Sequence, residues 1–141
     1  MEIMMQPIGV IRTPFKTRED LRLPPCHPDA PYHDPTVRGS IEVFPEFCDG
    51  IKDIEPGSYG MLLFHFDQST SYKLITHSHG QNRDNVGVFS TRSPNRPNGI
   101  GSSIVKFLKV EGCTITFQGV DMLDGTPLLD IKPNSGEKIF D

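Results

Sequence analysis

The stretch SIVKFLKVEGCTITFQGV, residues 103–120, contains two strand patterns joined by a turn. In its second part, residues 113–120, threonine and glutamine alternate with isoleucine and phenylalanine, so one face is polar and the other apolar. The first part, residues 103–110, precedes Glu111-Gly112, a pair that favours a two-residue hairpin. The stretch therefore predicts two antiparallel strands with one buried face.

Further strands are expected where β-branched and aromatic residues cluster between turn signals. They cover residues 8–12, 40–44, 59–66, 72–77, 86–90 and 128–131. Helical patterns are scarce, because 13 prolines and 13 glycines interrupt the chain, although residues 45–54 have room for one or two turns. We therefore predict an all-β fold in a single domain, residues 1–141. It is a small antiparallel β-barrel with one or two short helices and long loops at 14–39, 78–85 and 93–101.

The composition favours a soluble enzyme or binding domain over a membrane or disordered protein. Hydrophobic residues make up 35% of the chain, charged residues 23%, and the mean hydropathy is −0.34. No apolar run approaches the roughly 18 residues of a membrane helix, and residues 1–7 lack the basic start of a signal peptide. The net charge of −4 is unusual for a protein that binds nucleic acid. An RNA substrate would therefore need a local basic patch.

The three cysteines, Cys26, Cys48 and Cys113, are odd in number and widely spaced, which is not typical of a disulfide framework. We expect reduced thiols in a cytoplasmic protein. A metal site is a weaker alternative: the possible ligands do not match a usual zinc spacing, so no metal is predicted. These possible ligands are Cys26, His27, His33, His77 and His79.

The most distinctive chemistry lies in GVFSTRSPNRPNGIGSS, residues 87–103. Proline fixes the backbone, glycine allows close approach, and arginine offers a rigid fork of donors. The segment therefore indicates a stiff loop that holds an anion or a nucleotide. A surface turn with solvated arginines is the alternative.

This segment resembles the signature of the TsaA-like, or TrmO, family of methyltransferases. Two further segments are similar in the same order: IGVIRTPF, residues 8–15, and GVDMLDGTPLLDIKP, residues 119–133. The resemblance implies a β-barrel enzyme that acts as a homodimer. It further implies S-adenosyl-L-methionine as cofactor and N6-methylation of threonylcarbamoyladenosine 37 in tRNA. Two alternatives remain: a non-catalytic barrel that binds nucleotide or RNA, and a methyltransferase with another substrate.

The resemblance also implies which residues form the site. Arg92 matches an arginine that contacts the cofactor, where a guanidinium can hold the methionine carboxylate through two hydrogen bonds. Arg96 and Asn98, in the same loop, are expected to bind the substrate. The remaining cofactor positions are Ser102, Asp121, Met122, Leu123, Asp124, Asp67, Gln68, Pro24, Pro25 and Cys26. Candidate bases are Asp121, Asp124 and Asp67, since the acceptor nitrogen must lose a proton.

The chain departs from the family pattern in a few places. Asp67 stands where relatives carry histidine, and Gly99 replaces a proline. The early loop around Pro24 also diverges. Many bacterial members continue into a C-terminal domain, so we expect the tRNA affinity of this chain to differ from theirs.

Overall fold

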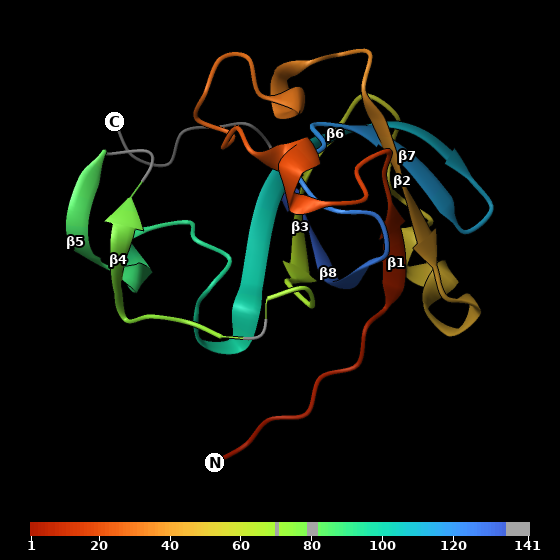
Figure 1. Ribbon diagram of the computed structural model, residues 1–141. Coiled ribbons are helices and arrows are strands. Elements are labelled where there is room, and N and C mark those ends of the chain that lie inside the picture. The colour runs from red at the N-terminus through yellow and green to blue at the C-terminus, as the bar shows by residue number, and fades with distance from the viewer. Residues whose placement is uncertain (70, 79–81, 135–141) are drawn as a thin grey trace.

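The computed structural model describes residues 1–69, 71–78 and 82–134 and is built around a closed barrel of six antiparallel strands (Figure 1). Around the barrel the strand order is β1-β2-β7-β6-β3-β8, and β4 and β5 form a separate two-stranded sheet. The strands are β1 (Gly9–Arg12), β2 (Arg38–Val43), β3 (Tyr59–His65), β4 (Ile75–Ser78), β5 (Arg83–Gly87), β6 (Ile100–Glu111), β7 (Thr114–Gln118) and β8 (Thr126–Asn134). The predicted all-β barrel is therefore confirmed.

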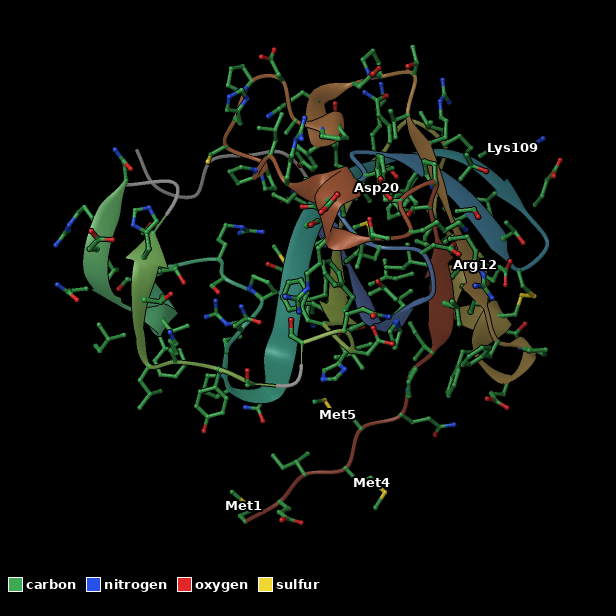
Figure 2. All side chains as sticks on the ribbon, in the orientation of Figure 1. Met1, Met4, Met5, Arg12, Asp20 and Lys109 are labelled. Carbon is green, nitrogen blue, oxygen red and sulfur yellow. A yellow bond between two sulfur atoms is a disulfide. The ribbon has the colours of Figure 1, made fainter. Side chains whose placement is uncertain are left out.

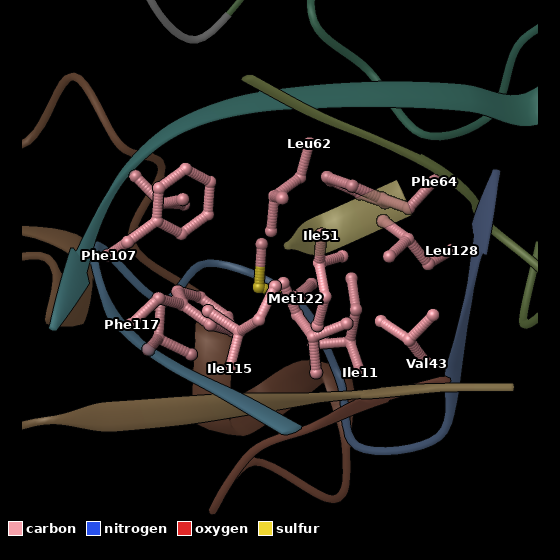
Figure 3. Close-up of a cluster of buried hydrophobic side chains, with 13 residues drawn as sticks. Ile11, Val43, Ile51, Leu62, Phe64, Phe107, Ile115, Phe117, Met122 and Leu128 are labelled. Carbon is pink, nitrogen blue, oxygen red and sulfur yellow. The ribbon is translucent and has the colours of Figure 1, made fainter. Parts of the chain in front are cut away.

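Alternation along each strand sends the apolar side chains into the barrel. Phe107 on β6 pairs with Phe117 on β7, and both are buried in a core that extends to Ile11, Leu62 and Leu128 (Figure 3). Glycine makes room for these rings: a Cβ on Gly60 would lie 2.4 Å from the ring of Phe107. Closure also pairs every barrel strand on both sides, so the described barrel itself has no open edge.

Short 3-10 helices connect the strands. They are η1 (Arg18–Leu21), η2 (Pro31–His33), η3 (Pro45–Ile51), η4 (Val88–Ser90) and η5 (Pro97–Gly99). The turns expected within 45–54 are present as η3, but the described residues contain more short helices than the one or two predicted. Three of them, η2, η3 and η5, start with proline, whose fixed φ suits the first helical position. None of these described helices has the length or the apolar character needed to span a membrane.

Several strand boundaries differ from the prediction: β6 and β8 extend beyond 103–110 and 128–131, and β4 begins at Ile75 instead of residue 72. The strand expected at 86–90 begins three residues earlier, as β5, and ends at Gly87. Residues 88–90, the rest of the expected strand, form η4 instead. The polar start of β5, Arg83-Asp84-Asn85, lacks strand-forming side chains, so the pattern concealed it. In the β6–β7 hairpin, Glu111 pairs with Thr114, so the turn residues are Gly112 and Cys113, one position later than expected.

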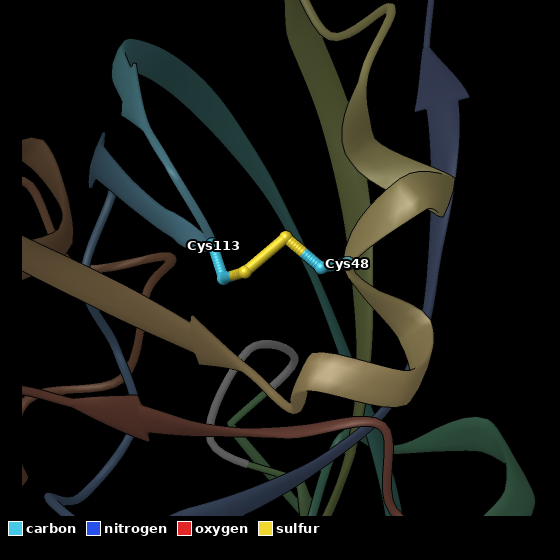
Figure 4. Close-up of a disulfide and its surroundings, with 2 residues drawn as sticks. All are labelled: Cys48 and Cys113. Carbon is cyan, nitrogen blue, oxygen red and sulfur yellow. A yellow bond between two sulfur atoms is a disulfide. The ribbon is translucent and has the colours of Figure 1, made fainter.

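The expectation of three reduced cysteines is wrong for two of them. Cys48 on η3 and Cys113 in the β6–β7 turn form a disulfide, with Cα atoms 5.3 Å apart (Figure 4). The pair is 65 residues apart in sequence, so spacing alone could not reveal it. Cys26 is a free, exposed thiol. The disulfide ties η3 to the hairpin at one side of the barrel.

Reduction of this disulfide should destabilise the fold. A cross-link across 65 residues removes conformational entropy from the unfolded chain, so we expect its loss to cost about 2–4 kcal/mol. Urea denaturation of the Cys48→Ser, Cys113→Ser double variant measures this change. Cys26→Ser is the matched control and should leave the free energy of unfolding unchanged. Equal stability of the double variant and the control would contradict the expectation.

Candidate functional site

A cavity of about 990 Å³ lies at the end of the barrel where β3 finishes and β6 begins. Phe64 and Gly101, paired across these two strands, contribute to its lining. The rest of the wall comes from segments that are far apart in sequence, within residues 18–32, 67–69, 76–78, 89–96 and 120–123. Its size and its position at a barrel mouth are typical of a small-molecule site.

Asp121 is the lining residue whose environment departs most from that of an ordinary aspartate. Ser103 Oγ on β6 is 2.6 and 2.7 Å from the two carboxylate oxygens of Asp121, which fixes the orientation of the carboxylate. Burial raises the pKa of Asp121 to about 6, although the Ser103 hydrogen bond and the charge of Arg92 act to lower it. Asp121 is therefore mostly ionised at neutral pH, yet it accepts a proton more readily than an ordinary aspartate does.

The backbone that carries Asp121 is held firmly by the first loop. Thr13 Oγ1 donates a hydrogen bond to the Met122 carbonyl at 2.9 Å, and the Asp124 backbone N–H donates to the Phe15 carbonyl at 2.7 Å. At the other end of the segment, Thr126 Oγ1 donates a hydrogen bond to the Leu123 carbonyl at 2.6 Å. These contacts pre-organise the segment before any ligand binds.

Asp124, the second acidic residue of the same motif, is not among the cavity-lining residues. Its carboxylate accepts hydrogen bonds from Lys16 Nζ at 2.8 Å and from the Thr13 backbone N–H at 3.0 Å. Lys16 above all, and then the Thr13 bond, hold the pKa of Asp124 below its usual value. The guanidinium NH1 of Arg12 on β1, which Figure 2 labels, lies 3.9 Å from Asp124 Oδ2. Asp124 is thus part of a structural ion-pair cluster.

The arginine loop, residues 89–96, forms another wall of the cavity. Arg92 lines it and donates a hydrogen bond to the Ser102 carbonyl. Arg96 also lines it, and its guanidinium NH1 donates to the Thr91 carbonyl at 2.7 Å, which stiffens the loop. Asn98 lies instead in a smaller hollow of about 200 Å³ that shares Arg96 with the cavity. Its positive φ of 67° places it in a tight turn.

The remaining predicted positions also border the cavity. Ser102, Met122 and Leu123 lie on the barrel side, whereas Asp67 and Gln68 follow β3. Pro24, Pro25 and Cys26 line it from the early loop. Arg18 NH2 ties this loop to the chain after β3, because it donates to the Gln68 carbonyl at 3.0 Å and to Ser69 Oγ at 2.9 Å.

Sequence reasoning missed several residues of the cavity. In the sequence, Ser103 stands at the end of the 87–103 segment and at the start of an expected strand, and Tyr32 lies within the loop expected at 14–39. The Tyr32 hydroxyl donates a hydrogen bond to the Ile104 carbonyl at 2.5 Å, and burial, with the charge of Asp121, raises its pKa. Tyr32 belongs to no motif, and Ser103 ends the 87–103 segment without a role of its own there, so only the spatial neighbourhood of Asp121 identifies them.

Positive charge gathers at the cavity although the whole chain is acidic. Four arginines line it, Arg18, Arg22, Arg92 and Arg96, against two aspartates, Asp67 and Asp121. Among the described residues no three side chains of the metal-binding types come together, and His79 lies outside the described residues. The cavity therefore combines a local cationic rim with one half-buried carboxylate.

Comparison with known proteins gives a consistent family assignment. Residues 10–137 match the family model of the tRNA-methyltransferase O N-terminal domain. A protein of Pyrococcus abyssi, described as a probable S-adenosyl-L-methionine-binding protein, is 42% identical over 93% of this chain and 67% of its own length. The mouse protein named tRNA (adenine(37)-N6)-methyltransferase is 37% identical over 93% of this chain, which spans only 30% of that protein.

Solved structures give the same result for the fold. The crystal structure of TrmO from Pseudomonas aeruginosa is 35% identical and superposes with a TM-score of 0.74. The match covers 95% of this chain and 56% of that chain. This chain therefore spans about half of the solved protein to which it is similar.

Proposed function

Because this chain belongs to the family of the tRNA-methyltransferase O N-terminal domain, we propose that it methylates tRNA with S-adenosyl-L-methionine. The acceptor is N6 of adenine 37, in agreement with the name of the mouse relative. The observation that carries the proposal is the cavity at the barrel mouth. There the arginine loop and the Asp121–Leu123 segment, which come from separate motifs, face one space.

The chemistry of the lining fits this cofactor. Bound there, S-adenosyl-L-methionine would supply a methyl group on a positively charged sulfur. The guanidinium of Arg92 suits the methionine carboxylate, and the Asp121 carboxylate suits the sulfonium cation. Ser102, Met122, Leu123 and the Pro24–Cys26 stretch provide the remaining wall for the adenosine.

Asp121 is the base that we favour among the three candidate aspartates. Asp124 is held by Lys16 and Thr13 and is not among the cavity-lining residues, and Asp67 lines the cavity but is exposed. An Asp121 oxygen would accept the proton that N6 must lose when it is methylated. Ser103 keeps that carboxylate oriented.

The arginines around the cavity support an RNA substrate, because they give an acidic protein local positive charge. Phosphate contacts require positive charge only where the RNA approaches. Arg18, Arg22, Arg92 and Arg96 supply it at the mouth of the cavity, despite the net charge of −4. The small hollow lined by Asn98 suits the carboxylate of a threonylcarbamoyl group on the same adenine, because the Asn98 amide can donate a hydrogen bond to it.

The assembly and location of the protein follow as parts of the same proposal. Leu74 and Ile75, each 58% exposed, lie on or next to the small sheet that stands apart from the barrel, an arrangement that suits a homodimer contact.

A tRNA substrate places the enzyme in the cytoplasm. A disulfide is rare there outside hyperthermophiles. Thiol labelling of freshly lysed cells would report the state of Cys48 and Cys113.

Mass spectrometry of tRNA nucleosides tests the proposed function. Unmethylated tRNA is incubated with the protein, with and without S-adenosyl-L-methionine. We expect a gain of one methyl on threonylcarbamoyladenosine only when the cofactor is present. Cofactor binding with a methyl group on a different acceptor would indicate another substrate. A protein that binds tRNA but not the cofactor would be a non-catalytic module, and the proposal would fail.

A further inference from the structure

Phe89 is an apolar aromatic side chain that the fold leaves in solvent. It is 73% exposed, although its neighbour Val88 is only 1% exposed. Three aromatic side chains of the described residues are exposed, Tyr59, Tyr72 and Phe89, and of these Phe89 alone lines the large cavity. A single exposed apolar side chain is common on protein surfaces. What points to a ligand is the place of Phe89 at the edge of the cavity.

The turn that carries Phe89 is rigid. The Val88 N–H donates to the Leu74 carbonyl at 2.8 Å, and the Val88 carbonyl accepts hydrogen bonds from Thr91 N at 3.0 Å and Thr91 Oγ1 at 2.8 Å. The ring is therefore presented by a fixed backbone on both sides, so little conformational entropy is lost when a ligand packs against it.

Arg96 sets the chemistry of the ring's surroundings. Its Cζ lies 6.0 Å from the Phe89 ring centroid, and its NH1 is held by the Thr91 carbonyl at 2.7 Å. One face of the ring is thus next to a guanidinium, which also attracts phosphate. Aromatic rings beside arginine are the usual means of binding unpaired bases together with their backbone.

We infer that Phe89 is a stacking platform for an unpaired RNA base that adjoins the acceptor nucleotide. This inference rests on the proposed function and adds a binding position outside the methyl-transfer centre. The acceptor enters the cavity, the neighbouring base lies on Phe89, and Arg96 contacts the phosphate between them. A contact with a second copy of the chain is the competing explanation, since Leu74, whose carbonyl accepts the hydrogen bond from the Val88 N–H, is also exposed.

Phe89→Leu and Phe89→Trp separate stacking from simple apolar contact. Leucine keeps the apolar character but has no π face, whereas tryptophan keeps the face. With S-adenosylhomocysteine present, we expect the Kd for tRNA to rise about tenfold for Phe89→Leu, as when one base–aromatic stack is lost, and to stay near the wild-type value for Phe89→Trp. The affinity for S-adenosylhomocysteine itself should not change.

A fluorescent base gives a direct readout. In an RNA hairpin with the anticodon loop, 2-aminopurine is placed in turn on each side of the acceptor adenine. We expect quenching at one of the two positions with wild type and Phe89→Trp, and its loss with Phe89→Leu. Unchanged tRNA affinity of Phe89→Leu, or no quenching at either position, would overturn the inference.

Leu74→Ala is the matched control for a contact between copies. Sedimentation velocity measures self-association of each variant. If Phe89→Leu and Leu74→Ala both weaken self-association and lower tRNA affinity in parallel, Phe89 belongs to a protein interface and the inference is wrong. The proposed function fails differently, through the absence of methyl transfer by the wild-type protein.

Discussion

Replacement of Asp121 by asparagine should lower kcat for tRNA methylation by at least about a hundredfold. A positioned general base contributes roughly 10²–10⁴-fold, and an amide cannot accept the N6 proton. Asparagine keeps the size of the side chain and can still accept a hydrogen bond from Ser103. S-adenosylhomocysteine carries no sulfonium charge, so its affinity for the variant should remain close to that for wild type. Single-turnover methyl transfer and calorimetry measure the two quantities.

Stability and pH give an independent check on the same carboxylate. The folded pKa of Asp121 is raised from 3.8 to about 6, so ionisation destabilises the fold as pH rises through this window. Asp121→Asn removes that cost. We expect it to be more stable than wild type at pH 7, by up to about 3 kcal/mol, with the difference vanishing below about pH 4. The wild-type rate should fall as pH drops below about 6.

Asp124→Asn is the matched control. Its carboxylate forms hydrogen bonds with Lys16 and Thr13, and its lowered pKa means that its ionised form stabilises the fold at neutral pH. This variant should lose stability and retain most of its kcat, the opposite of Asp121→Asn. A large kcat loss in Asp124→Asn with little change in Asp121→Asn would contradict the choice of Asp121.

Replacement of Arg92 by alanine should raise the Kd for S-adenosyl-L-methionine by about tenfold or more. A hydrogen bond to a charged group contributes about 1.5–3 kcal/mol. The charge of Arg92 also lowers the pKa of Asp121, so this guanidinium lies close to the expected cofactor site. Arg92→Lys should recover only part of the affinity, because lysine cannot form the two parallel bonds.

Arg38→Ala controls for the loss of positive charge. Arg38 is exposed on β2 and is not among the cavity-lining residues. Calorimetry should give wild-type cofactor affinity for this variant. If Arg92→Ala also binds the cofactor as tightly as wild type, Arg92 does not hold the methionine carboxylate.

The strand pattern predicted the barrel because burial imposes period-two alternation wherever one face meets the core. Residues 113–120 show this clearly and contain β7, whereas residues 59–66 are a nearly continuous apolar run that contains β3. β5 begins with Arg83-Asp84-Asn85 in a sheet outside the barrel, so no buried face marks it. The Cys48–Cys113 disulfide joins two positions that only barrel closure brings together, and no local pattern encodes that approach.

The candidate site was predictable as a set of segments but not as a set of roles. Asp121 and Asp124 are three residues apart in one motif and have the same chemistry in sequence. Their environments separate them: Asp121 faces Ser103 beside the cavity, whereas Asp124 faces Lys16 away from it. Ser103, Tyr32 and Phe89 acquire their importance only from tertiary position.

The most direct test is a crystal structure of the protein with S-adenosylhomocysteine. The account predicts that the ligand lies in the barrel-mouth cavity, with its carboxylate at Arg92 and its sulfur on the side of Asp121. A ligand bound elsewhere on the protein, with this cavity left to solvent, would contradict the account.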